Sequence, residues 1–164
     1  ASLMNLPVLF VCENNLYSVY THINDRQPKR DIEEIGKAHN IKSIRVDGND
    51  VLEVTKASKE LINDAKTKNN PSLLVLDTYR QREHCGVNFD DDLNYRDKRE
   101  VKSWFSNDPV DFAIKIFCKQ NLIKENEILE IKYKLKKIVE VSFQKAIEAD
   151  YPSPEMAKKY VYAK

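Results

Sequence analysis

The segment Glu13-Asn14-Asn15-Leu16-Tyr17 places oxygen-bearing groups directly after an apolar run, residues 6–12, that reads LPVLFVC. Such a run is typical of a strand buried on both faces of a parallel sheet. Ligands of open α/β sheets bind beyond the carboxyl ends of these strands. A side-chain amide and an exposed backbone carbonyl are hard oxygen ligands suited to Mg²⁺, which usually also takes phosphates and waters. The alternative is a plain strand-exit turn, because Asn tolerates left-handed backbone.

His84 lies in a polar stretch, residues 80–96, that follows another apolar run at 72–79. Because both apolar runs are expected to be parallel strands, their carboxyl ends share one edge, and we expect His84 to converge there with Asn15. An imidazole in that position could donate a proton or hold a polar intermediate. The alternative is a solvated loop histidine.

Two charged runs are interpreted without chemistry. The acidic run, residues 90–92, lacks the Gly and the terminal Glu of a calcium loop, so we expect a solvated or salt-bridged loop. The basic run, residues 132–137, is flanked on the same helix by Glu127, Glu130 and Glu140, which favours a solvated helix face.

The three cysteines, Cys12, Cys85 and Cys118, are odd in number, widely spaced and free of any CxxC pair. We therefore expect reduced thiols in a cytoplasmic protein and neither a disulfide framework nor a structural zinc site. Cys85 adjoins His84, but neighbours in an extended segment point to opposite faces, which disfavours a Cys/His nucleophile.

Composition excludes several classes of function. The chain of 164 residues has 27 basic and 26 acidic side chains, hence a net charge of +1, so we expect no nucleic-acid partner. No apolar run approaches the roughly 18 residues of a spanning helix, so no membrane partner is expected either. Only 3 glycines occur, and GxGxxG, Walker-type and GxSxG motifs are missing, which disfavours a dinucleotide-binding domain.

The candidate residues need an α/β scaffold, and the pattern of the chain predicts one. Strands are expected at 6–12, 42–47 and 72–79, with helices at 31–39 and 50–66 between them. Asp31 with Glu34, and Asp50 with Glu53, predict the capped starts of these helices, so VDGND is interpreted as a turn plus a helix cap. This alternation predicts right-handed crossovers and a parallel sheet. A strand buried on both faces at the start of the chain needs neighbours on both sides, so we expect the α/β domain to be incomplete at its N-terminus.

The second half of the chain is expected to be helical. A helix begins at Asp108-Pro109, a longer one with an apolar stripe covers 124–149, and a short one begins at Ser153-Pro154. We therefore predict the C-terminal portion of an α/β domain at 1–122. The helical extension predicted at 123–164 packs on that domain or on a partner subunit.

The motifs LPVLFVCENNLY, VDGND, TYR with a His four residues after the Arg, and YR occur in this order. Together they resemble the alpha subunits of thiamine-diphosphate-dependent 2-oxo acid dehydrogenases, of the pyruvate and branched-chain types, and of acetoin dehydrogenases. The ending PSPEMAKKYVYA also resembles that family's closing segment. ENN or VDGND alone is a weak signal, but the ordered set is specific and spans nearly the whole chain.

The resemblance implies a thiamine-diphosphate-binding α/β fold with thiamine diphosphate and Mg²⁺ as cofactors. The family's cofactor signature begins with Gly-Asp-Gly and ends at the Asn-Asn that Asn14-Asn15 matches, so only its second half is present. By resemblance, the Asn15 side chain and the Tyr17 backbone carbonyl bind Mg²⁺. His84 would lie beside the cofactor and the acyl intermediate.

The implied activity is that of an oxidoreductase: oxidative decarboxylation of a 2-oxo acid and acyl transfer to a lipoyl group. Implied partners are a beta subunit, within a heterotetramer, and a lipoyl-bearing acyltransferase. Acetoin cleavage is one alternative, and an inactive, partner-binding α/β fragment is another. In pyruvate-type members the loop reads His-Gly-His-Ser, whereas here it reads Arg82-Glu83-His84-Cys85, so a thiol replaces a serine that is phosphorylated in some animal members.

Overall fold

The computed structural model describes residues 1–159 and 161 and divides into two compact units, Ala1–Ile116 and Phe117–Lys164. The first unit holds the sheet and the candidate site, and the second holds the long helix. Among the described residues, no helix combines the length and the apolar character that a membrane crossing needs.

The first unit is built on a three-stranded parallel sheet in the order β1-β5-β4, with β1 at Leu9–Asn14, β4 at Lys42–Asp47 and β5 at Ser72–Asp77. Leu9 and Lys42 lie beside Ser72, and Asn14 and Asp47 lie beside Asp77, so all three strands begin and end in register. The predicted α/β class with a parallel sheet is confirmed.

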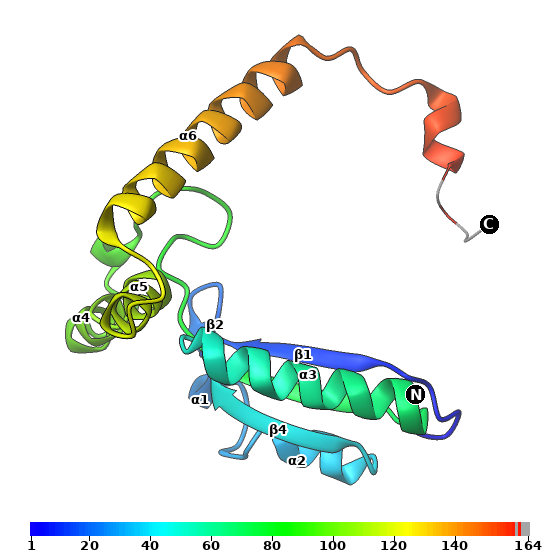
Figure 1. Ribbon diagram of the computed structural model, residues 1–164. Helices are drawn as coiled ribbons and strands as arrows, with labels where there is room; N and C mark the ends of the chain where they lie inside the picture. Colours follow the sequence, from blue (N-terminus) through cyan, green and yellow to red (C-terminus); the bar gives the residue numbers. More distant parts are fainter. Residues whose placement is uncertain (160, 162–164) are drawn as a thin grey trace. The chain divides into compact units, whose positions relative to one another are not determined.

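Helices cover both faces of this sheet. The connection between β4 and β5 is α3, Val51–Lys68, which lies along one face in Figure 1 and buries Ala57 and Leu61 against Leu74. Helix α2, Glu33–Ala38, packs through Gly36 against Ser43 and Leu73. Since successive strand residues face opposite sides, Leu73 and Leu74 mark the two faces.

The helix starts follow the predicted capping pattern only in part. Asp50 caps α3, because its carboxylate accepts hydrogen bonds from the backbone N–H groups of Leu52 and Glu53. Asp31 does not cap α2, and the prediction is wrong there: the N-cap is Ile32, and the Asp31 carboxylate lies instead 3.4 Å from the Arg45 guanidinium.

The expectation that the first strand is buried on both faces is wrong within this unit. β1 is an edge strand whose Phe10 and Val11 side chains are 44% and 54% exposed, whereas Leu74 and Val75 of β5 are buried. β5 is the strand with neighbours on both sides, and it alone shows the burial expected of a central parallel strand.

Short elements that the sequence did not predict complete the first unit. After β1 come a small antiparallel ribbon, β2 at Tyr17–Ser18 with β3 at Thr21–His22, and the single turn α1 at Ile23–Arg26. The long loop after β5 contains the turn η1, Asp91–Leu93, and leads to α4, Lys98–Phe105. Helix α5, Pro109–Lys119, begins at the predicted proline, with Asp108 capping its first turn.

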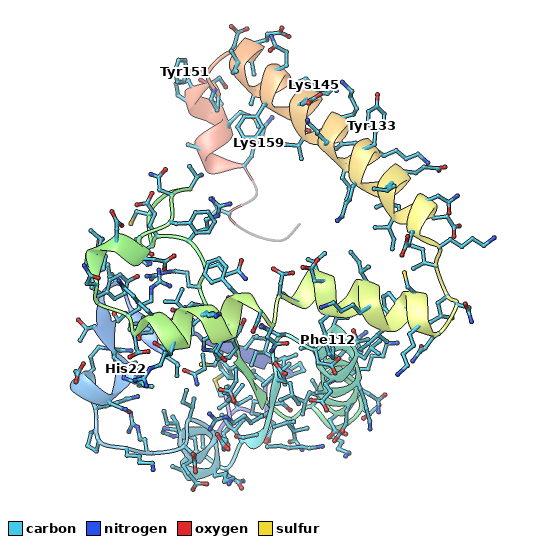
Figure 2. All side chains as sticks on the ribbon, turned by 90° about the vertical axis from the view of Figure 1, so that its left-hand side faces the viewer. His22, Phe112, Tyr133, Lys145, Tyr151 and Lys159 are labelled. Carbon is cyan, nitrogen blue, oxygen red and sulfur yellow. The ribbon has the colours of Figure 1, made fainter. Side chains whose placement is uncertain are left out.

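The second unit consists of α6, Glu125–Glu148, and the turn η2, Pro154–Lys158. The long predicted helix is confirmed as α6, and the short one begins at the predicted Ser153-Pro154 but is a 3-10 helix. The apolar stripe of α6 is exposed at Ile131, Leu135 and Ile138, and Figure 2 shows Tyr133 and Lys145 among side chains that radiate from this helix. The end of the predicted helical extension, residues 160 and 162–164, lies outside the described residues.

Candidate functional site

The carboxyl edge of the sheet is held together by one ion-paired carboxylate. Nδ2 of Asn14, at the buried end of β1, donates a hydrogen bond of 2.8 Å to Oδ1 of Asp77. Arg45 of β4 binds the same carboxylate with two donors, Nε at 2.6 Å and Nη2 at 3.0 Å. The chain Arg45–Asp77–Asn14 therefore joins all three strands at the point where the Asn15 loop begins.

The loop after β1 carries backbone strain. Leu16 and the β-branched Val19 have φ angles of 68° and 55°, in the left-handed region that such residues rarely adopt. Oδ1 of Asn15 accepts a hydrogen bond of 3.1 Å from the N–H of Tyr17, which closes a tight turn around Leu16. Strained positions of this kind cluster at binding sites and persist where the surroundings fix them.

A cavity of about 340 Å³ opens at this edge, with Asn15 in its wall. The other residues that line it come from β1, from the turn after β4 and from the end of β5: Glu13, Gly48, Leu76, Thr78, Tyr79 and Arg80. Gly48 is needed there because a Cβ at this position would lie 2.8 Å from the carbonyl oxygen of Asp77. The VDGND motif, predicted as a turn and a helix cap, thus also shapes the cavity.

Tyr17 is anchored by its side chain. Its hydroxyl donates a hydrogen bond of 2.6 Å to Oε2 of Glu100, on the first turn of α4. Its ring meets the rings of His22, Tyr79 and Tyr95 edge to face, with centroids 5.1, 6.4 and 5.7 Å away. Burial, followed by the hydrogen bond to Glu100, raises the pKa of Tyr17, so the phenol stays protonated.

The long loop after β5 is folded around a buried ion pair. Asp90 and Arg96 are both buried and bind each other, and Nη1 of Arg96 donates to the carbonyl oxygen of Arg80 at 2.6 Å. The predicted salt-bridged loop is therefore confirmed for Asp90. Nη2 of Arg80 donates to Val19 O at 2.9 Å and to Tyr95 Oη at 2.7 Å, which ties this loop to the Asn15 loop.

His84 lies in the same loop, but its side chain is exposed. It does not line the cavity that contains Asn15, and it makes no hydrogen bond or ion pair with another residue of the described part of the chain. The structure thus brings Asn15, Tyr17 and Arg80 together and leaves His84 apart from them. The role of His84 stays a prediction.

The donor groups at this edge suit Mg²⁺ bound to a diphosphate. A carboxamide oxygen and a backbone carbonyl are hard ligands, and a guanidinium in the same wall complements negative charge. Residues 1–159 and 161 contain no cluster of three or more His, Cys, Asp or Glu side chains able to hold a metal ion. Other ligands of a bound Mg²⁺ would include diphosphate oxygens and water.

The sequence analysis assigned no role to two residues of the site. Arg80 appeared there only as part of the TYR motif. Glu100 was not singled out, because helix α4 was not predicted. The signal for α4 is present: Asp97 and Glu100 have the spacing of a helix-capping pair, and the Asp97 carboxylate accepts hydrogen bonds from the N–H groups of Arg99 and Glu100.

Comparison with known proteins identifies the family. The family model "Dehydrogenase E1 component" matches residues 1–155. The 2-oxoisovalerate dehydrogenase subunit alpha of Bacillus subtilis is 32% identical over 165 residues, which cover 100% of this chain and 49% of that protein. The pyruvate dehydrogenase E1 component subunit alpha of Rickettsia bellii is 29% identical over 162 residues, 99% of this chain and 49% of that protein. The mitochondrial 2-oxoisovalerate dehydrogenase subunit alpha 1 of Arabidopsis thaliana is 39% identical over 111 residues, 67% of this chain and 23% of that protein.

The chain thus spans about half the length of the first two of these relatives, both of them alpha subunits. The match to the family model extends from β1, through the strained loop and the buried ion pair, to the turn η2. The chain belongs to the dehydrogenase E1 component family.

Proposed function

We propose that this chain is part of the alpha subunit of a thiamine-diphosphate-dependent dehydrogenase that decarboxylates a 2-oxo acid and passes the acyl group to a lipoyl group. The family match and the names of the relatives support the reaction class. The cavity at the carboxyl edge of the sheet supports a cofactor site, because open α/β sheets bind ligands there.

Within this proposal, Asn15 Oδ1 and the Tyr17 carbonyl bind Mg²⁺, and the Arg80 guanidinium adds positive charge near the diphosphate. The Arg45–Asp77–Asn14 chain holds the end of β1, which leads directly into the loop that carries both ligands. His84, on the exposed loop, donates or accepts a proton near the reacting carbon. Thiamine diphosphate, when bound, supplies the electron sink for cleavage of the carbon–carbon bond.

The substrate is a small 2-oxo acid, and the names of the relatives favour pyruvate or 2-oxoisovalerate. A beta subunit completes the site, and a lipoyl-bearing acyltransferase takes the acyl group. The helical extension, residues 123–164, packs on the α/β domain or on the beta subunit. The exposed apolar stripe of α6 supports its role as a contact surface.

The observation that carries this proposal is the strained loop after β1, in which Asn15 lines the cavity at the carboxyl edge of the sheet. It is tested by calorimetric titration of the complete gene product, co-expressed with its beta subunit, with thiamine diphosphate and Mg²⁺. We expect Asn15→Ala to weaken Mg²⁺-dependent cofactor binding at least about tenfold, because one of only about six metal ligands is lost.

Asn63→Ala is the matched control, since Asn63 is exposed on α3 and far along the chain from the site. Cofactor binding that is unaffected by Asn15→Ala contradicts the assignment of this ligand. A wild-type complex that binds no thiamine diphosphate contradicts the enzyme proposal as a whole and favours the inactive, partner-binding alternative.

A further inference from the structure

The side chain of Tyr17 has a partner that lies far away in sequence. Its hydroxyl reaches Glu100 across 83 positions at an O···O distance of 2.6 Å. This length is typical of a charge-assisted hydrogen bond from a hydroxyl to a carboxylate, which is about twice as strong as a neutral one. Both residues are half-buried, so water competes with this bond less than it does at an exposed surface.

Glu100 is itself held in place. It lies in the first turn of α4, where the Asp97 carboxylate accepts hydrogen bonds from two backbone N–H groups, that of Arg99 at 2.7 Å and that of Glu100 at 3.3 Å. Trp104, in the same helix, stacks on Tyr79 with ring centroids 5.4 Å apart. Tyr79 follows β5 and lines the cavity, so α4 contacts the cavity wall through Trp104 and the Asn15 loop through Glu100.

The loop around Tyr17 needs such an anchor. Leu16 and Val19, which flank the ribbon strand Tyr17–Ser18, both have left-handed backbone angles. Such backbone angles are unfavourable for residues that carry a side chain, and they relax unless the surroundings fix them. A rotation of the peptide groups beside Leu16 would turn the Tyr17 carbonyl, whereas a fixed Tyr17 ring opposes this rotation.

We propose that Glu100 is a positioning residue: through the Tyr17 hydroxyl it holds the Tyr17 backbone carbonyl in the orientation that binds Mg²⁺. This inference rests on the function proposed above. It assigns a task to helix α4, which contributes no ligand of its own, and it separates the two roles of Tyr17, since the metal contact is made by the backbone and the anchor by the phenol.

The separation of roles allows a direct test in the complete gene product with its beta subunit. Tyr17→Phe keeps the carbonyl and removes the anchor, and Glu100→Ala removes its acceptor. We expect either change to raise the Kd for Mg²⁺, measured at saturating thiamine diphosphate, about tenfold. The double variant should show no further increase, because both changes break one bond. Glu100→Gln keeps an acceptor oxygen and should stay within about twofold of wild type.

Further readouts separate positioning from general stability. Tyr20→Phe, which alters an exposed neighbouring ring, should leave Mg²⁺ affinity unchanged. The inference is overturned if Tyr17→Phe binds Mg²⁺ as the wild type does, or if the two single effects add in the double variant. It is also overturned if the loss of affinity merely follows the loss of melting temperature in the metal-free proteins. Failure of the wild-type complex to bind the cofactor, by contrast, refutes the proposed function before any variant is made.

Discussion

At the scale of single residues, the long loop after β5 depends on a buried ion pair. The Asp90 and Arg96 side chains are 3% and 2% exposed, which charged residues tolerate only when paired. The Arg96 guanidinium also lies over the rings of Tyr79 and Tyr95, at 5.2 and 4.9 Å from their centroids. Arg96 thus contacts both the long loop after β5, through Asp90, and the wall of the cavity, through Tyr79.

Asp90→Ala is expected to open this loop. It leaves the buried Arg96 charge with only the longer contact, of 3.6 Å, to the Asp91 carboxylate. Loss of one partner of a buried ion pair typically costs about 3–5 kcal/mol, more than most loops can absorb while remaining closed. Trypsin cleavage after the exposed Arg82 should therefore become at least about tenfold faster. Asp92→Ala is the control, because Asp92 is exposed on the same turn. Equal cleavage rates in the two variants would show that the ion pair does not hold the loop.

The sequence predicted a salt-bridged acidic run, but it could not tell which aspartate turns inward. Three identical side chains in succession differ only in the contacts that the fold gives them, and only Asp90 is buried. The same reason explains His84. Its place in the long loop follows from the strand that precedes it, whereas its exposed side chain depends on contacts that no local pattern encodes.

At the scale of elements, the sequence predicts the sheet better than its surroundings. The strand at 42–47 has the predicted bounds, and α3 begins at the predicted cap, because β-branched runs and capping residues are local signals. β1 begins three residues later than residue 6 and ends at Asn14, where its partner β5 ends at Asp77. The bounds of a strand depend on the strand with which it pairs, and the apolar run alone does not identify that partner.

The elements that were missed are those that tertiary contacts stabilise. β2 and β3 have two residues each and are joined through Val19, without the Asn-Gly or Asp-Gly that marks a hairpin in sequence. Helix α4 has eight residues and a recognisable capping pair, and it was not among the predicted helices. Tyr17 lies in β2 and donates a hydrogen bond to α4, so the surroundings of this proposed metal ligand were the least predictable part of the site.

Helix α2 offers a test of close packing. A Cβ on Gly36 would collide with Ser43 Oγ and lie 3.1 Å from Leu73 Cδ2, so a side chain there would have to displace Ser43. Gly36→Ala should lower the free energy of unfolding by about 1–3 kcal/mol, the usual cost of overpacking. The measurement is urea unfolding of the complete gene product, followed by circular dichroism.

The double variant Gly36→Ala, Ser43→Ala removes the colliding hydroxyl and should recover most of the loss. Ser43→Ala alone is the control, since it tests the small contribution of the hydrogen bond from Ser43 Oγ to the Ile41 carbonyl. A Gly36→Ala protein as stable as the wild type would mean that α2 moves away from the sheet at little cost.

At the scale of the whole molecule, the described chain leaves two apolar surfaces open. One is the outer part of β1, with Phe10 and Val11, and the other is the apolar stripe of α6. Each belongs to a different compact unit. Exposed apolar surface of this extent is typical of contacts with further protein, which agrees with relatives that are about twice as long.

The number of proposed Mg²⁺ ligands on this chain also indicates that further protein is needed to bind the cofactor. The proposed site takes two Mg²⁺ ligands from this chain, Asn15 and Tyr17, whereas Mg²⁺ requires about six. Diphosphate and water can provide some of the others, and the proposed beta subunit would provide the binding surface for the thiamine end. Residues 1–164 expressed alone should therefore show no thermal shift with thiamine diphosphate and Mg²⁺ at concentrations that stabilise the complete gene product with its beta subunit.

The control is the same chain with Asn15→Ala, whose melting curve should not respond to the cofactor either. A thermal shift of the isolated wild-type chain that Asn15→Ala abolishes would show that these residues form a sufficient site by themselves, and the proposed dependence on a beta subunit would be wrong. A shift that persists in Asn15→Ala would instead place the cofactor elsewhere on the chain. A response confined to the complete complex is the result expected if the carboxyl edge of this sheet forms one wall of a site that other chain segments close.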